Sequence, residues 1–162
     1  MNDRNYPLLT KLFLDLEVEL HPTSMSFGVE TDYLKWCSND FLKLKFLRSL
    51  KKIRLFFEMI RFNSLASDVK SNSSIEDWLR ENNFSDFFRE NYIFPMSASI
   101  WSSSQESINK FPMKSLSSFF KNHGLLDLIK RPQWFSVLGG SNTYIDKIIK
   151  KSQIKNLFLN AQ

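Results

Sequence analysis

The stretch QWFSVLGGSNTYIDKIIKK, residues 133–151, carries a short apolar run, two glycines and an amphipathic segment. The run at residues 134–138 predicts a β-strand, and a helix is predicted from about Asn142 with Ser141 as its N-cap. Gly139 and Gly140 could present backbone N–H groups to an anion at the helix N-terminus. The pattern is not G-x-G-x-x-G, however, and the acidic residue expected about 20 positions later is missing. Spacing alone therefore favours a simple strand-to-helix turn.

Outward from this stretch, helical and extended patterns alternate along the chain. Pro7 fits the first position of a helix that begins in NYPLLTKLF, and two alternating runs around Thr31 predict a β-hairpin. Residues 41–62 return to helical spacing, which puts one apolar face on Leu42, Phe46, Leu50, Ile53, Phe57 and Ile60. This face is expected to pack into the core, with the lysines and arginines of the segment in solvent.

Three further helices have recognisable ends. Ser73 or Ser74 is the predicted N-cap of SIEDWLREN, and Ser85 is the predicted N-cap of a helix that stops before Pro95. A third helix, PMKSLSSFFKNHG, ends at Gly124, which suits the C′ position. This order of elements predicts an α+β fold that is predominantly helical and contains a small mixed or antiparallel sheet.

The composition indicates one domain with an ordinary core. The chain has 162 residues, 15% of them aromatic, and a formal charge of +5. Cys37 is the only cysteine, so an internal disulfide is excluded. Neither a signal-peptide pattern nor an apolar run long enough to cross a membrane is seen. We therefore expect a cytoplasmic location, and the charge favours an anionic partner or surface.

The sequence lacks the usual metal and nucleophile patterns. His21 and His123 lie far apart, and neither a CxxC nor an HExxH spacing occurs, so no metal site is expected. No GxSxG motif is present. Asp15, Glu17 and Glu19 cluster, but their spacing fits a solvated helix end. No catalytic residue is therefore identified.

The segment 41–62 suggests a function at a membrane surface. Its apolar face and basic flanks, with Glu58 as the only acidic residue, suit an anionic lipid surface. The alternative is a core-facing helix with a solvated basic side, which is the commoner use of such a pattern. Nucleic acid is not expected as a partner, because no nucleic-acid module is recognised and the aromatic residues are not interleaved with the charges.

Four stretches carry a resemblance to a known family. NDRNYPLLTKLFLDLEVELHPTSMSFGV, FPMSASIWSSS, FFKNHGLL and RPQWFSVLGGSNTYI occur in this order. Together they resemble the central region of bacterial FAD-dependent oxidoreductases of the flavin-containing amine oxidase superfamily, described as predicted NAD/FAD-binding proteins. The resemblance covers essentially the whole chain. It implies a two-domain flavoprotein in which a substrate domain is inserted into an FAD-binding domain.

This chain departs from that pattern, because the glycine-rich fingerprint and the C-terminal FAD-binding segment are absent from it. The resemblance therefore implies a single substrate-domain fragment over residues 1–162 that lacks the Rossmann unit. Residues 5–40 would form a helix and a hairpin, and residues 41–130 the helical part. Residues 131–162 would form a strand, the Gly-Gly turn, a helix and a strand that returns toward the FAD domain.

The resemblance also implies two groups of site residues. The group on the cofactor side comprises Asn5, Tyr6, Pro7, Gln133, Trp134, Gly139 and Gly140. The group lining the substrate cavity comprises Ser26, Phe27, Ile100, Trp101, Ser102 and His123. His123 is the only one of these that protonates near neutral pH, although a position at a helix C-terminus would also explain it.

Three functions follow as expectations. The first is the substrate domain of an FAD-dependent oxidoreductase that acts on an apolar or amphipathic small molecule and is inactive as this chain alone. The second is a stand-alone helical binding module at an anionic membrane surface, which would be membrane-peripheral. The third is a subunit that completes a separate FAD-binding chain.

Overall fold

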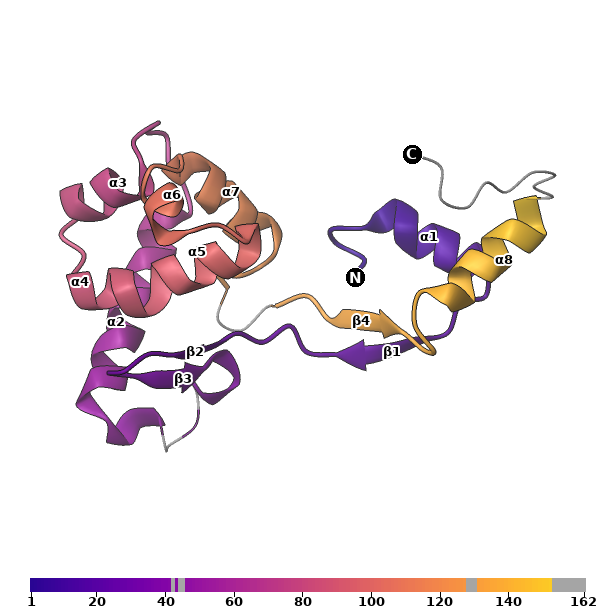
Figure 1. The fold of residues 1–162 in the computed structure, drawn as a ribbon, viewed down its shortest axis with the longest axis horizontal. Coiled ribbons are helices and arrows are strands. Elements are labelled where there is room, and N and C mark those ends of the chain that lie inside the picture. Colours follow the sequence, from indigo (N-terminus) through magenta and orange to yellow (C-terminus); the bar gives the residue numbers. More distant parts are fainter. Residues whose placement is uncertain (42, 44–45, 128–130, 153–162) are drawn as a thin grey trace. The chain divides into compact units, whose positions relative to one another are not determined.

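The computed structural model describes residues 1–162 except 42, 44–45, 128–130 and 153–162 (Figure 1). Contacts within the chain gather in two compact units. Unit 1 combines Met1–Met25 with the segment that begins at Pro132, and unit 2 is Ser26–Arg131. Unit 2 is thus an insertion between two segments of unit 1.

Unit 1 consists of two helices and one two-stranded antiparallel sheet. Its elements are α1 (Pro7–Asp15), β1 (Leu20–Thr23), β4 (Trp134–Val137) and α8 (Asn142–Ser152). Strands β1 and β4 come from opposite ends of the chain and lie side by side, with Leu20 opposite Val137 and Thr23 opposite Trp134 (Figure 1). The predicted strand at 134–138 and the helix from Asn142 are confirmed, and their partner across the sheet is β1.

Pro22 is accommodated in β1 because of its place in the ladder. It lies opposite Phe135, whose amide donates to the carbonyl of Met1 at 2.7 Å. The carbonyl of Phe135 accepts from the amino group of Met1, also at 2.7 Å. The backbone N–H and C=O of Phe135 are therefore both bonded to Met1. Pro22 lies opposite Phe135 at a position where the pairing of β1 with β4 needs no N–H.

Unit 2 is a β-hairpin followed by short helices. The hairpin pairs β2 (Gly28–Glu30) with β3 (Lys35–Cys37), and its turn closes with Thr31 donating to the Leu34 carbonyl at 3.0 Å. The helical elements are the 3₁₀ turns Ser38–Asp40 and Phe46–Arg48, α2 (Leu50–Ala66), α3 (Ile75–Glu81), α4 (Asp86–Phe88), the π-helical segment Arg89–Ile93, α5 (Phe94–Trp101), α6 (Gln105–Asn109) and α7 (Met113–Asn122). The predicted α+β, mostly helical class and the hairpin are confirmed.

Phe62 lies at the centre of the core of unit 2. It is fully buried and meets the rings of four neighbours at centroid distances of 5.7–6.2 Å. These neighbours are Trp78, Phe84, Phe88 and Phe120. Edge-to-face and tilted rings at this spacing add to the stabilisation from burial itself. Three helices and the loop before α4 are joined to α2 in this way.

The prediction for residues 41–62 was wrong in two respects. The α-helix begins at Leu50, since Phe46 belongs to a separate 3₁₀ turn and Leu42 lies outside the described residues. Of the predicted core face, Phe46 is buried, but Leu50 is 85% and Phe57 is 65% exposed, so on α2 itself this face is the outer one. The face that packs inward carries Leu55, Met59, Phe62, Asn63 and Ala66.

The predicted helix end before Pro95 was also wrong. Pro95 lies within α5, directly after a π-helical segment. In an α-helix the amide of residue 95 would donate to the Asn91 carbonyl, and proline has no amide hydrogen. The indole nitrogen of Trp36 donates to that carbonyl instead, at 2.8 Å in a buried position. A side chain from β3 thus satisfies the acceptor, and the helical course continues.

Candidate functional site

Tyr6, Gln133 and Trp134, three of the predicted cofactor-side residues, come together in unit 1, whereas Gly139 and Gly140 lie beyond the other end of β4. The rings of Tyr6 and Trp134 meet edge to face with their centroids 6.2 Å apart. Gln133 donates from Nε2 to the carbonyl of Thr23 at 3.0 Å. The loop before α1 and the start of β4, which are far apart in sequence, therefore form one cluster.

The loop before α1 is held by a buried asparagine. Asn2 is fully buried, and its Oδ1 accepts the backbone N–H of Asn5 at 2.7 Å. The Tyr6 amide donates to the Asn2 carbonyl at 3.1 Å, and Tyr6 is the N-cap of α1 with Pro7 in the first turn. This arrangement confirms the predicted helix start and fixes the backbone of Asn5, Tyr6 and Pro7.

Gly139 and Gly140 form a turn. Both have left-handed backbones, with φ of 79° and 84°. The Gly140 amide donates to the Val137 carbonyl at 3.3 Å, and the Gly140 carbonyl accepts from Thr143 Oγ1 at 2.8 Å. The glycine amide that an anion would need is used inside the turn. This turn therefore does not fit the pyrophosphate of FAD, and no reaction step is assigned to it.

Gly140→Ala is expected to lower the free energy of unfolding by about 1–2 kcal/mol, because alanine is strained in the left-handed region. The site has room for a methyl group, since nothing lies within 4 Å of the added Cβ. Backbone conformation alone is therefore tested, by urea unfolding followed by circular dichroism. Gly28→Ala is the control, because its added Cβ makes only an ordinary 3.8 Å contact with the Trp36 carbonyl. Equal stability of the two variants would contradict the prediction.

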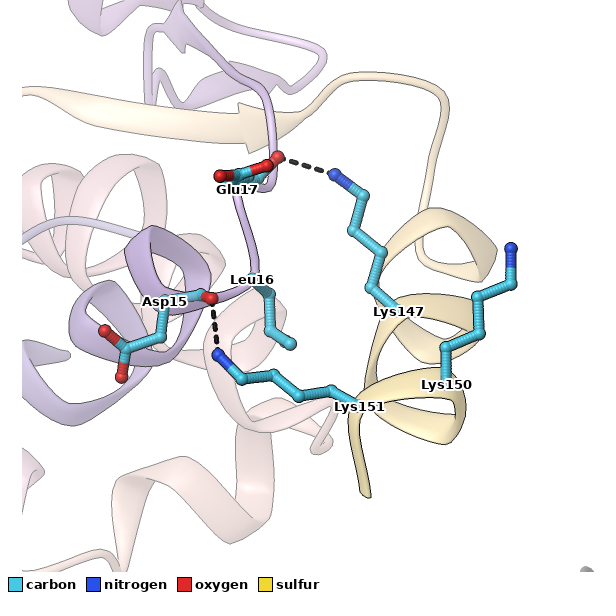
Figure 2. A pocket seen from close by; sticks show the side chains of 6 residues that line it. All are labelled: Asp15, Leu16, Glu17, Lys147, Lys150 and Lys151. Carbon is cyan, nitrogen blue, oxygen red and sulfur yellow. Dashed lines mark hydrogen bonds between the residues drawn. The ribbon is translucent and has the colours of Figure 1, made fainter. Parts of the chain in front are cut away.

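A basic hollow lies between the C-terminus of α1 and α8. It is open, has a volume of about 390 Å³ and is lined by Asp15, Leu16, Glu17, Lys147, Lys150 and Lys151 (Figure 2). Lys147 donates to the Glu17 carbonyl at 2.5 Å, and Lys151 donates to the Asp15 carbonyl at 2.6 Å. The negative end of the helix dipole makes these carbonyls favourable partners for cations. Figure 2 shows the Lys151 ammonium turned to the Asp15 carbonyl at the end of α1 and the Lys147 ammonium turned to the Glu17 carbonyl just after it. These two lysines therefore join α8 to the C-terminal end of α1.

The predicted cavity residues of unit 2 divide between two places. Trp101 packs on Phe119 at 5.2 Å between ring centroids, and Phe119 stacks on His123 at 3.9 Å. Phe111 extends this row on the other side of Trp101, at 4.9 Å. We call these four half-buried residues the aromatic row. The structure therefore brings Trp101 and His123 to one surface, with Ile100 and Ser102 next to Trp101 in the chain.

His123 has the position predicted from its neighbourhood, at the C-terminus of a helix. It is the C-cap of α7, and its Nδ1–H donates to the Phe119 carbonyl at 2.9 Å. Gly124 follows with a φ of 66°, and the Leu125 amide donates to the Phe120 carbonyl at 2.8 Å. This is the Schellman pattern, so the predicted C′ role of Gly124 is confirmed.

Ser26 and Phe27 lie at the start of the hairpin. The Phe27 amide donates to Ser38 Oγ at 3.0 Å, and the Ser38 amide donates to the Phe27 carbonyl at 2.8 Å. Phe27 is partly buried against the core of unit 2, while Ser26 is exposed. They precede Gly28, which is one of the residues that line a second hollow.

The hairpin hollow is a site that the sequence did not predict. It has a volume of about 470 Å³ and is lined by Gly28, Val29, Glu30, Lys35, Trp36, Cys37, Asp40 and Lys52. That volume lies in the range of about 300–1,000 Å³ typical of small-molecule sites. Lys35 pairs with Glu30 at 2.7 Å, and the Asp40 carboxylate, 2.6 Å from Lys43, raises the pKa of that lysine. The hollow therefore suits a polar ligand better than an apolar one.

The residues that line the hairpin hollow come from the hairpin, the turn after it and the start of α2, so no sequence spacing rule could have predicted it.

Among the described residues, no group of three His, Cys, Asp or Glu side chains is placed to hold a metal ion. Within the same part of the chain, no helix has the length and apolar character needed to cross a membrane. Neither a protein-family model nor a curated protein matches this sequence.

Proposed function

We propose that this chain is the substrate-domain part of an FAD-dependent oxidoreductase of the flavin-containing amine oxidase superfamily. The observation that carries the proposal is the insertion of unit 2 between two segments of unit 1 that pair as β1 and β4. The sequence resemblance implies an order of the same kind, in which a substrate domain is inserted into an FAD-binding domain and the chain then returns to that domain. A dinucleotide-binding unit from another segment or another chain would have to hold the FAD.

Within unit 1, the residues proposed to face the cofactor are the cluster of Tyr6, Gln133 and Trp134. The resemblance places these residues near the flavin, and their contacts support a shared role because they join both ends of unit 1. The Gly-Gly turn follows the opposite end of β4, after Val137. The proposed role of this turn is to orient α8, which follows it.

In unit 2, we propose the aromatic row as the surface that contacts the substrate. Half-buried rings of Trp101, Phe111 and Phe119 offer apolar surface, and the His123 ring adds a polar edge. Such a surface suits an apolar or amphipathic small molecule. The flavin would supply the redox chemistry, and this chain would orient the substrate and exclude water.

The chain alone is expected to bind no FAD and to oxidise no amine, because its sequence has no G-x-G-x-x-G fingerprint and the Gly140 amide is already bonded within its turn. Flavin absorbance of the purified chain measures this directly. Joining or co-expressing it with the segments encoded on either side is expected to give a yellow protein with one FAD. Formation of that complex from separate chains would identify this chain as a subunit acting in trans. A stoichiometric flavin on the chain alone, or flanks without a dinucleotide-binding unit, would contradict the proposal.

Two tryptophan variants of the flavin-loaded protein separate the cofactor side from the substrate side. Trp134→Leu is expected to weaken FAD binding by about tenfold through loss of the aromatic contact with Tyr6 and the flavin side. Trp101→Leu should leave FAD binding unchanged and raise the KM for substrate. Unchanged FAD affinity in Trp134→Leu, or loss of FAD in Trp101→Leu, would show that the two sides are wrongly assigned.

A further inference from the structure

Helix α2 presents an apolar surface to solvent. Leu50, Ile53, Phe57 and Ile60 recur at helical spacing on its outer side, and we call these four residues the α2 stripe. Leu50 is 85% and Phe57 is 65% exposed, Ile60 is exposed, and Ile53 is half-buried. The opposite side of the helix already fills the core through Leu55, Met59 and Phe62. The stripe is thus additional to the residues that the fold of unit 2 requires.

The stripe is flanked by cations whose positions are fixed by packing. Arg61 lies over the Phe84 ring at 4.1 Å, and Arg54 lies over the Phe87 ring at 5.3 Å. Arg61 also donates to the Asn82 carbonyl. Lys51 is exposed beside them at the start of the helix. Arg61 keeps its full charge in its contact with Phe84, since cation–π packing does not neutralise a cation.

The one carboxylate of α2 is turned away from solvent. Glu58 has a side chain that is only 14% exposed, and it accepts from the backbone N–H and hydroxyl of Ser85 at 3.0 and 2.6 Å. It also pairs with Arg54 at 3.2 Å. The acidic group is therefore used to fix the N-cap of α4. The outer side of α2 carries apolar and positive groups.

An exposed apolar stripe with fixed cations beside it matches the chemistry of an anionic lipid surface. Helices of this kind lie in the interface plane with their apolar side chains among the acyl chains and their cations at the phosphates. We propose that α2 docks unit 2 on an anionic phospholipid membrane through the α2 stripe, with Lys51, Arg54 and Arg61 at the headgroups. This inference is independent of FAD.

Co-sedimentation of the whole chain with vesicles tests the proposal. Vesicles of phosphatidylcholine with phosphatidylserine should bind the chain, and vesicles of phosphatidylcholine alone should bind it much less. Lys51→Glu should weaken vesicle binding by at least about tenfold. Each basic residue near an anionic membrane contributes substantially to the binding free energy, and this variant replaces one positive charge with a negative one. Phe57→Ser should weaken binding by about tenfold through loss of an inserted ring. Both positions are exposed, so circular dichroism should show an unchanged fold.

Two control variants test whether vesicle binding depends on the α2 stripe and its cations in particular. Lys114→Glu makes the same charge change at an exposed position of α7, and Leu14→Ser removes an exposed apolar side chain of α1. Both controls should bind vesicles like the unchanged chain. Equal loss in variants and controls, or binding that ignores phosphatidylserine, would overturn the proposal. Absence of vesicle binding would also overturn it, and self-association abolished by Phe57→Ser would then identify a second copy as the occupant of the stripe.

Discussion

Phe62→Ala is expected to lower the free energy of unfolding of unit 2 by about 3–5 kcal/mol, which is the usual cost of truncating a fully buried phenylalanine. The ring is fully buried and touches four other aromatic rings from three helices and the loop before α4. Those partners are anchored by their own helices, so they cannot all move into the space that is left. Urea unfolding followed by tryptophan fluorescence measures this effect, because Trp36, Trp78 and Trp101 belong to unit 2.

Phe57→Ala is the matched control on the same helix. Its ring is 65% exposed, and the change should alter the free energy of unfolding by no more than about 0.5 kcal/mol. The pair tests which face of α2 packs inward, because spacing alone predicted Phe57 on the core side. A larger cost for Phe57→Ala than for Phe62→Ala would mean that α2 is rotated from the position described.

The ends of several helices could be predicted because local chemistry decides them. Ser74 and Ser85 accept the backbone N–H groups of Asp77 and Phe88, as N-cap serines do. Pro7 has no amide to lose in a first turn, and Gly124 adopts a left-handed backbone without strain. Each signal needs only a few neighbouring residues, all present in the sequence.

The orientation of α2 could not be predicted because the helix carries apolar residues on two sides. Leu50, Phe57 and Ile60 are spaced by seven and three residues, and Leu55, Met59 and Phe62 by four and three, so each set fits one side of a helix. A periodicity argument cannot choose between two such stripes. The choice comes from partners distant in sequence, among them Trp78, Phe88 and Phe120, whose rings meet Phe62.

The pairing of β1 with β4 and the continuation of the helical chain through Pro95 could not be predicted from the sequence for the same reason. β1 contains Pro22, which normally argues against a strand, and it is acceptable because Phe135 bonds Met1 instead. Pro95 normally ends a helix, and Trp36 supplies the missing donor. In both places a residue distant in sequence satisfies the hydrogen bond that proline cannot make, so the usual rule that proline ends a helix or strand does not hold.

For the candidate site, the Gly-Gly turn was predicted from its own residues. The meeting of Tyr6 with Trp134 was expected only through the family resemblance, because no local pattern joins the two chain ends. The hairpin hollow and the lysine contacts between α8 and α1 were missed. Both depend on side chains that gather from separate segments, and neither has a sequence motif.

Asn91→Ala is expected to lower the free energy of unfolding of unit 2 by about 3 kcal/mol, since it removes two hydrogen bonds from a buried position and leaves a small cavity. Asn91 is 3% exposed and lies in the π-helical segment. Its Nδ2 donates to the Phe87 carbonyl at 2.9 Å, and its Oδ1 accepts from the Thr31 hydroxyl at 2.8 Å. The side chain thus ties the hairpin turn to the helices.

Asn82→Ala provides the comparison, because Asn82 makes the same kind of bond to the carbonyl of Trp78, at 2.8 Å, in a less buried place. Asn82→Ala is expected to lower the free energy of unfolding by less than about 1 kcal/mol. A double-mutant cycle with Thr31→Val then isolates the contact between the hairpin and the π-helical segment, with an expected coupling of about 1 kcal/mol. Strictly additive effects of the two changes would show that this hydrogen bond does not hold the hairpin. The stability of the hairpin would then rest on the Trp36 indole and its bond to the Asn91 carbonyl, which neither substitution removes.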